Sequence, residues 1–201
     1  YSTIKKLQII YKKELIPAIT ILKKRGLKVV LGTSIGAEDH QFAGNDELRT
    51  SDFQTMLDHP EIDAIWCARG GYGTVRIIDQ LDFSNFKNYP KWIIGYSDIT
   101  VLHAHLHQLG IETLHAQMPL FIETKSDATI NSIKETLFGE KYEIIIPSEK
   151  NNINGIASGQ LIGGNLSILY SLCGSPSALN TKGKILFIED LDEYLYHIDR
   201  M

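Results

Sequence analysis

The fold is decided by Trp92-Ile93-Ile94-Gly95-Tyr96-Ser97-Asp98-Ile99-Thr100, a stretch near the middle of the chain. Its apolar start predicts a buried strand over residues 92–95, and the apolar spacing that follows predicts a helix over residues 98–109. A buried strand that runs directly into a helix is the repeating unit of α/β proteins with a parallel sheet.

The same alternation of strands and helices continues on both sides of this stretch. Apolar runs predict further strands at residues 28–32, 63–68, 111–115 and 142–146. Apolar residues at helical spacing predict helices at residues 13–25, 46–58, 74–81 and 128–138. The pattern predicts a Rossmann-like N-terminal domain over residues 1–146, built on a parallel sheet.

A change in composition follows this domain. Residues 147–155 contain Pro, Gly and several Asn, which is typical of a linker, and we place the linker at residues 147–158. Residues 159–201 contain a predicted helix, strand and helix start, too little for an independent core. They are interpreted as the beginning of a smaller, β-containing C-terminal domain. The start at Tyr1 and the stop inside a helical pattern indicate a chain truncated at both ends.

Composition excludes several classes of protein. The 201 residues are 43% hydrophobic and 22% charged, with a formal net charge of −4, which excludes global disorder and disfavours nucleic-acid or anionic-membrane binding. The two cysteines, Cys67 and Cys173, are too few for a disulfide framework or a zinc site. Neither a transmembrane run nor a secretion signal is visible, so we expect a cytoplasmic protein.

Ser97 occupies the turn between the central strand and its helix. A serine held on such a turn projects its hydroxyl above the sheet, where the amides of a helix N-terminus can stabilise an oxyanion. The Gly-x-Ser-x-Gly pattern of α/β hydrolases is only half matched, because Ile99 replaces the second glycine. A serine or aspartate before a helix is also a common helix cap, so both interpretations stay open.

Two further segments place chemical groups after predicted strands. The segment Ala68-Arg69-Gly70-Gly71-Tyr72-Gly73-Thr74 can turn backbone amides towards an anion, or can be a tight turn. It lacks the third glycine of the dinucleotide fingerprint. The strand at residues 184–188 runs into Glu189 and Asp190, and a carboxylate there could orient a histidine, bind metal or favour a helix start.

The histidines are the remaining candidates. His103 and His107 share one face of the predicted helix, but the Glu of the His-Glu-x-x-His zinc motif is absent, so a metal role is disfavoured. His115 lies near a strand end, and His197 follows Glu193 by four residues on a predicted helix. A surface or core histidine is the commoner explanation for each of them.

Five motifs occur in an order that resembles the LD-carboxypeptidase family of serine peptidases, which includes murein tetrapeptide carboxypeptidases and microcin C self-immunity hydrolases. They are Arg69-Gly70-Gly71-Tyr72-Gly73, Gly95-Tyr96-Ser97-Asp98-Ile99-Thr100, Leu114-His115-Ala116-Gln117-Met118-Pro119, Gly163-Gly164-Asn165-Leu166-Ser167 and Leu186-Phe187-Ile188-Glu189-Asp190. The similarity extends over nearly the whole chain.

The resemblance implies a Ser-Glu-His hydrolase without metal or other cofactor. Ser97 would be the nucleophile and Glu189 the triad carboxylate, with Glu193 as the fallback. The amides of Gly71 and Asp98 would form the oxyanion hole. The substrate would be a murein tetrapeptide, cut at the L,D-peptide bond to its terminal D-Ala in the cytoplasm. No nucleic-acid or membrane partner is expected, and a homodimer is compatible with the family.

Two departures from the family pattern concern the ends of the chain. The family's first strand would precede Tyr1, and its triad histidine would follow Met201, because none of the seven histidines here matches it. Two other functions stay open. One is hydrolysis of peptide-nucleotide conjugates, and the other is a non-catalytic module that binds an anionic peptide.

Overall fold

The computed structural model describes residues 10–141 and 143–201. Its helices are α1 (Ile16–Lys24), α2 (Asp46–Asp58), α3 (Ser84–Asn88), α4 (Thr100–Gln108), α5 (Asp127–Leu137), α6 (Leu166–Ser171) and α7 (Leu195–Arg200). Its strands are β1 (Ala64–Trp66), β2 (Trp92–Gly95), β3 (Leu114–His115), β4 (Leu161–Asn165) and β5 (Ile185–Glu189). Short 3₁₀ helices occupy Lys12–Leu15, Thr74–Arg76, Ile78–Gln80, Ser97–Ile99 and Ile122–Thr124.

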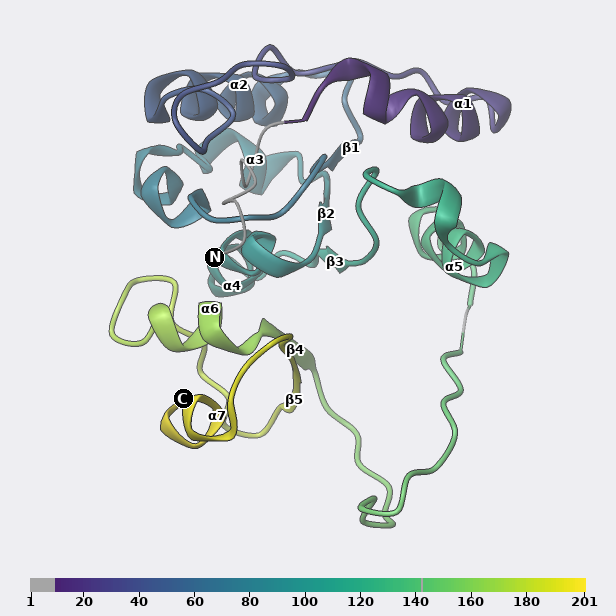
Figure 1. The fold of residues 1–201 in the computed structure, drawn as a ribbon, viewed down its shortest axis with the longest axis vertical. Coiled ribbons are helices and arrows are strands. Elements are labelled where there is room, and N and C mark those ends of the chain that lie inside the picture. The colour runs from purple at the N-terminus through teal and green to yellow at the C-terminus, as the bar shows by residue number, and fades with distance from the viewer. Residues whose placement is uncertain (1–9, 142) are drawn as a thin grey trace.

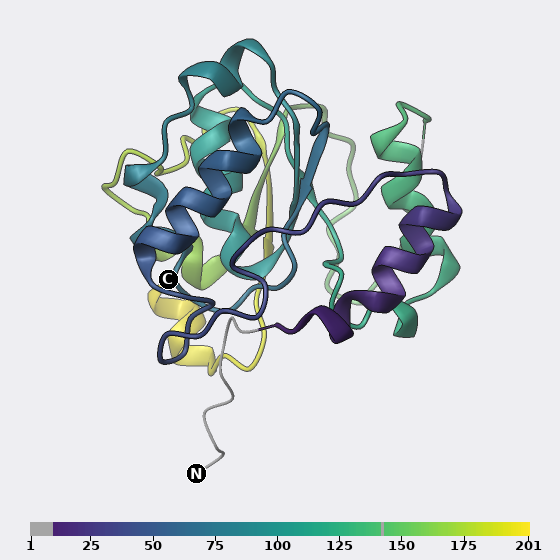
Figure 2. The same ribbon diagram turned by 90° about the horizontal axis from the view of Figure 1, so that it is seen from above.

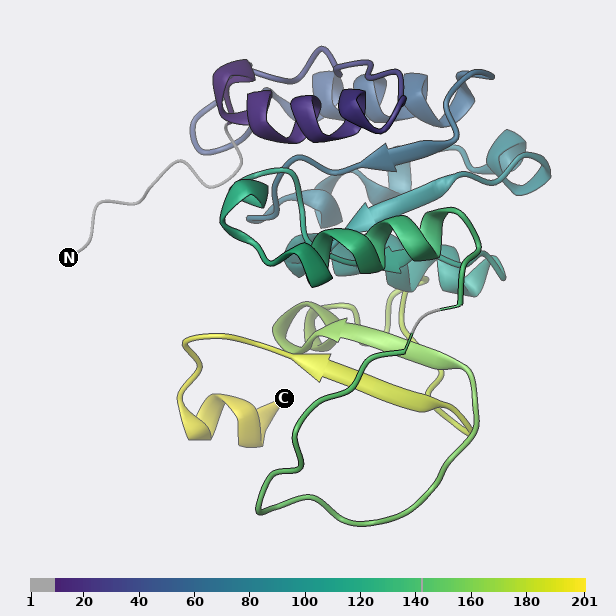
Figure 3. The same ribbon diagram turned by 90° about the vertical axis from the view of Figure 1, so that its right-hand side faces the viewer.

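Two parallel sheets organise the molecule. Strands β1, β2 and β3 form one sheet in that order, and both of its pairings are parallel. Helices α2, α3 and α4 lie on one side of this sheet, and α1 and α5 lie on the other (Figures 1, 2 and 3). Strands β4 and β5 form a second parallel sheet. The α/β fold with a parallel sheet, predicted from the alternation of elements, is confirmed.

The core lies between the first sheet and the helices on its α2–α4 side. It is built from side chains of β2, α4 and the neighbouring turns, including Ile93, Val101 and Leu106, each at most 1% exposed. Leu172, which follows α6, belongs to the same core, so the segment that begins with β4 packs on the first sheet and its helices. Burial of each such side chain stabilises the folded state by about 1.5–3 kcal/mol, so β2 and α4 are held firmly in place.

The predicted strand at residues 28–32 is wrong. The segment has no regular secondary structure, and Val30 is 51% exposed. Residues of this segment and of β1 line a cavity of about 480 Å³. A strand exists only through backbone hydrogen bonds to a neighbour, so an apolar, β-branched run is insufficient where no neighbouring strand pairs with it.

Three other local predictions need correction. Residues 74–81, predicted as one helix, form two short 3₁₀ helices. The predicted strand at residues 142–146 is not formed over 143–146, which are exposed, and residue 142 lies outside the described residues. Strand β4 was not predicted, because the glycines at positions 163 and 164 are disfavoured in strands and remove the apolar pattern of one. A Cβ on Gly163 would lie 1.7 Å from the Phe187 carbonyl oxygen, so close pairing of β4 with β5 requires glycine there.

The described part of the chain contains no helix that is long and apolar enough to cross a membrane. Residues 143–160 form neither helix nor strand and connect α5 to β4 as an extended loop (Figure 1). The isoleucines of this loop at positions 144–146, 153 and 156 are all more than 70% exposed.

Candidate active site

Ser97 lies on the turn between β2 and α4, in the first position of a 3₁₀ helix. Its φ of +62° is in the left-handed region, which a non-glycine residue adopts at a cost of about 1–3 kcal/mol. The expected sharp turn with unusual backbone angles is therefore confirmed. Such strain persists only where the surrounding structure imposes it, and here buried β2 and buried α4 hold both ends of the turn.

The helix-cap interpretation of Ser97 is wrong. Neither the 3₁₀ helix Ser97–Ile99 nor α4 has a side-chain cap, and their N-cap residues are Tyr96 and Ile99. Within residues 10–141 and 143–201, the Ser97 hydroxyl makes no hydrogen bond with another residue. Its hydroxyl is therefore available to a substrate or to a base.

The glycine-rich loop after β1 packs against Ser97. A Cβ on Gly70 would lie 3.0 Å from the Ser97 Cβ and 3.1 Å from its Oγ. Gly71 and Gly73 adopt φ values of +121° and +132°, which residues that carry a Cβ rarely adopt. Because β1 and β2 are parallel neighbours, their following loops meet at the same carboxyl edge of the sheet, where sites of α/β proteins gather. The loop thus reaches Ser97 through Gly70, and the assignment of the Gly71 and Asp98 amides as oxyanion donors stays a prediction.

The side chain of Asp98 turns into the protein instead of capping α4. It is 1% exposed, and its Oδ2 accepts hydrogen bonds from the Thr74 amide at 2.9 Å and the Thr74 hydroxyl at 2.6 Å. Burial raises the pKa of this carboxyl, while the bonds from Thr74 oppose the shift. Local sequence predicts only the Asp98 amide as an oxyanion donor or its side chain as a helix cap, and no local pattern indicates the bonds of its carboxylate to Thr74.

Glu189 ends β5, and its register partner on β4 is Asn165. The backbone N–H of Asn165 donates to Thr100 Oγ1 at 3.0 Å, and Gly164 has no room for a side chain beside Thr100. This end of the second sheet therefore lies against the first turn of α4, three residues after Ser97. Phe187 packs edge-on against His115, with 5.1 Å between the ring centroids. Strand alternation places Phe187 on the same face of β5 as Glu189.

One oxygen of Glu189 lacks a partner. Its Oε1 is buried without a hydrogen bond to any residue that the structure describes. Burial raises the pKa of the Glu189 carboxyl, the charge of Asp190 adds to the rise, and a hydrogen bond from Asn165 opposes it. Glu189 also lines a cavity of about 290 Å³. Glu193, the fallback, is instead paired with His197 Nδ1 at 2.5 Å.

The histidines of α4 and β3 serve the interior and the packing of the second unit. His103 is buried, with Nε2 at 2.9 Å from the Gly95 oxygen and Nδ1 at 2.8 Å from Thr113 Oγ1. His105 bonds Ser177, and His107 bonds Lys184. Over the described ranges, none of them hydrogen-bonds Ser97, and no group of three His, Cys, Asp or Glu side chains could hold a metal ion.

The burial of His103 predicts a dependence of stability on pH. Burial lowers the pKa of His103 to about 4, from 6.5 for a free imidazole. Between these values the unfolded chain takes up a proton that the folded chain does not, so acidification stabilises the unfolded state. We expect the free energy of unfolding to fall by about 3 kcal/mol through this group between pH 7 and pH 4. Urea unfolding at a series of pH values measures this loss.

His103→Gln provides the comparison, because glutamine can still donate to the Gly95 oxygen without titrating. The variant should lose stability at pH 7 but show a flatter profile between pH 6.5 and pH 4. An unchanged profile would assign the acid sensitivity to other groups.

Comparison with known proteins identifies the family. The LD-carboxypeptidase N-terminal domain matches residues 4–116, and the LD-carboxypeptidase C-terminal domain matches residues 158–201. The chain is 41% identical over 197 residues to a probable murein peptide carboxypeptidase of Bacillus subtilis, covering 94% of this chain and 61% of that protein. It is 29% identical to the microcin C7 self-immunity protein MccF of Escherichia coli, covering 94% of this chain and 65% of that protein.

The solved structures give the same result. The crystal structure of muramoyltetrapeptide carboxypeptidase from Oxalobacter formigenes superposes with a TM-score of 0.81 at 29% identity, covering 98% of this chain and 67% of that one. The chain spans 61% of the length of the Bacillus protein, and only about half of some other curated relatives. Because the N-terminal domain match alone includes more than half of its residues, the chain belongs to the LD-carboxypeptidase family.

Proposed function

We propose that the protein containing this chain is a metal-independent serine carboxypeptidase that removes the terminal D-Ala of murein tetrapeptides in the cytoplasm, during peptidoglycan recycling. The observation that carries the proposal is Ser97, held in a left-handed backbone at the carboxyl edge of the sheet, with its hydroxyl against Gly70. The 41% identity to a probable murein peptide carboxypeptidase supports this substrate class.

In the proposed reaction, Ser97 Oγ attacks the carbonyl carbon of the L,D-peptide bond and passes its proton to an imidazole. The amides of Gly71 and Asp98 would stabilise the negative charge that develops on the carbonyl oxygen. The imidazole then protonates the leaving nitrogen, D-Ala departs, and an acyl-serine ester remains. Water, deprotonated by the same imidazole, hydrolyses the ester and restores the Ser97 hydroxyl.

Glu189 is the proposed carboxylate of the triad. Its buried Oε1 has an unused acceptor site, which an imidazole N–H would satisfy, and the adjacent cavity leaves room for a side chain. We propose that this imidazole comes from a residue after Met201, since the described histidines of α4 bond other groups.

The division of the chain is also a proposal. We place the nucleophile in a domain over residues 1–146, the linker at 147–158, and the carboxylate in the partial domain 159–201. The absence of helix and strand from residues 143–160 supports a connecting segment in this region.

The experiment that tests the function uses the full-length protein and two substrates in parallel. One is a murein tetrapeptide ending in D-Ala, and the other is an aminoacyl sulfamoyl adenosine, which represents peptide-nucleotide conjugates. We expect release of D-Ala from the first at a kcat of at least about 1 s⁻¹. Faster hydrolysis of the second would instead assign a self-immunity function.

A fluorophosphonate separates both hydrolases from a non-catalytic peptide-binding module. An activated serine should be labelled covalently at Ser97, which mass spectrometry of the Ser97 peptide detects. Absence of labelling together with tight tetrapeptide binding would establish the binding module instead.

A further inference from the structure

A single peptide unit in the glycine-rich loop is held at both of its ends by buried charged side chains. The Gly73 carbonyl accepts a hydrogen bond from Arg49 Nη1 at 3.1 Å. The amide of the same peptide unit, that of Thr74, donates to Asp98 Oδ2 at 2.9 Å. Arg49 and Asp98 are 7% and 1% exposed. Hydrogen bonds to ionised partners are stronger than neutral ones, so the orientation of this peptide plane is fixed from both sides.

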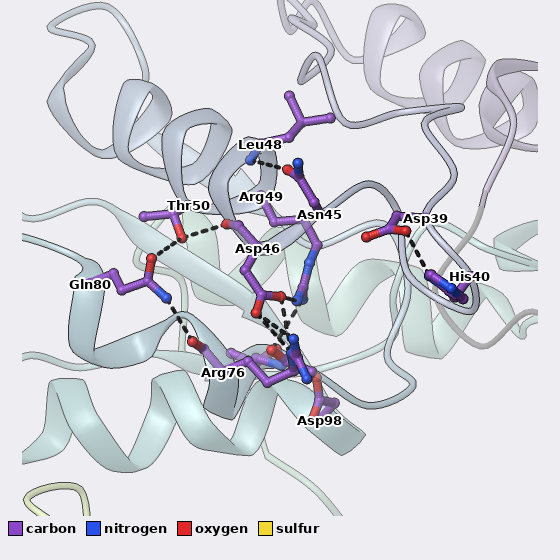
Figure 4. Close-up of polar contacts among 12 residues, drawn as sticks. Asp39, His40, Asn45, Asp46, Leu48, Arg49, Thr50, Arg76, Gln80 and Asp98 are labelled. Carbon is purple, nitrogen blue, oxygen red and sulfur yellow. Dashed lines mark hydrogen bonds and ion pairs between the residues drawn. The ribbon is translucent and has the colours of Figure 1, made fainter.

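The two side chains come from different elements. Arg49 lies on α2, while Asp98 directly follows Ser97 on the turn after β2. Figure 4 draws both side chains together with that of Arg76, two residues after Thr74. The Thr74 hydroxyl adds a third bond, to the same Asp98 oxygen, at 2.6 Å. The Asp98–Thr74 bonds therefore connect the glycine-rich loop directly to the residue next to Ser97.

Arg49 is itself held in place. Asp46 pairs with both Arg49 and Arg76, and both guanidinium groups lie over the Phe42 ring, at 4.9 Å and 5.1 Å from its centroid. A Cβ on Gly73 would lie 2.9 Å from Arg49 Nη1 and 2.9 Å from Phe42. The loop can thus approach Arg49 only because residue 73 is glycine, and the contact leaves no space for the loop to shift towards α2.

We propose that Asp98 and Arg49 are positioning residues that fix the glycine-rich loop relative to Ser97. This inference rests on the proposed function, in which the two oxyanion donors lie on separate segments. The Gly71 amide is on the loop, the Asp98 amide is on the Ser97 turn, and the Asp98 carboxylate joins the two segments through Thr74. A displacement of about 1 Å at a catalytic group can cost about 10²-fold in rate.

The test compares Asp98→Asn with wild type in the full-length protein. Both Thr74 bonds end on Asp98 Oδ2, so an asparagine oxygen can still accept them, but it carries no charge and the two bonds become weaker. We expect kcat for D-Ala release to fall about 10²-fold with KM changed less than about 3-fold, as for loss of an oxyanion donor. Thr74→Val loses only the hydroxyl bond, so its kcat should fall about 10-fold. Thr74→Ser keeps the hydroxyl and should retain the wild-type kcat.

Asp52→Asn is the matched control. Asp52 is 8% exposed and accepts hydrogen bonds from the amides of Thr33 and Ser34, so it resembles Asp98 in burial and bonding. The control should lose stability but keep kcat. If Asp52→Asn lowers kcat as much as Asp98→Asn does, general destabilisation explains both variants and the positioning role is overturned.

Hydrogen exchange supplies a readout that does not depend on the substrate. In Asp98→Asn and Arg49→Met, amides of residues 69–76 should exchange faster by at least about 10-fold, while those of α4 stay protected. Unchanged exchange in this segment overturns the inference even if kcat falls. Faster exchange with an unchanged kcat overturns it as well. If wild type releases no D-Ala, the proposed function fails, and the exchange data still decide whether the two side chains hold the loop.

Discussion

Ser97→Ala in the full-length protein is expected to lower kcat for D-Ala release from a murein tetrapeptide by at least about 10⁴-fold. Without Oγ no acyl-enzyme can form, and only binding and oxyanion stabilisation remain. The measured quantity is D-Ala released per enzyme per second, with tetrapeptide affinity measured separately by calorimetry. Affinity should change little, because alanine keeps the Cβ that packs near Gly70.

Two control variants make this result specific. Ser126→Ala removes a serine that does cap a helix, since the Ser126 side chain accepts from the Thr129 amide at the start of α5. It should cost about 1 kcal/mol of stability and leave kcat unchanged. Ser97→Gly should be inactive yet at least as stable as Ser97→Ala, because glycine adopts a φ of +62° without strain. Wild-type release by Ser97→Ala would show that Ser97 is not the nucleophile.

Glu189→Gln is expected to lower kcat by about 10⁴-fold, the effect of an equivalent substitution in well-studied serine hydrolases. Glutamine preserves the shape of the side chain but presents an NH₂ group where the carboxylate would accept the imidazole N–H. It would thereby favour the wrong tautomer of the base. The change should affect kcat more than KM, because the charge of Glu189 matters most when the imidazole is protonated.

Glu193→Gln is the control on the neighbouring carboxylate. Glu193 lies just before α7 and is paired with His197, four residues further along the chain. Loss of the Glu193 charge should therefore change kcat by less than about 3-fold. If Glu193→Gln were the more damaging substitution, the fallback assignment would replace Glu189 as the triad carboxylate.

The elements that the sequence predicted well are those decided by local side chains. The strand at residues 92–95 and the helix at residues 46–58 match β2 and α2 in both boundaries. Ser97 and Glu189 could be singled out because each lies at the carboxyl end of an apolar strand, which is where the sites of parallel sheets gather.

The features that escaped prediction depend on neighbours distant in sequence. Residues 28–32 have the composition of a strand, but pairing decides whether a strand forms. Strand β4 contains two glycines, which disfavour strands in isolation and are required here by close contacts with Phe187 and Thr100. The bonds of Arg49 to Gly73 and of Asp98 to Thr74 each join residues 24 apart, with no periodic signal that links them.

The hydrogen bond between Asn165 and Thr100 has a consequence for the order of folding. It joins residues 65 apart in the sequence, and it places the strand that pairs with Glu189 against the helix that follows Ser97. Loop closure over such a separation costs more entropy than the local turns around β2, so we expect this contact to form late in folding. During synthesis the N-terminal unit emerges first. A nascent chain therefore carries the proposed nucleophile well before its proposed carboxylate, and we expect the proposed hydrolysis only after the C-terminal unit has emerged and packed.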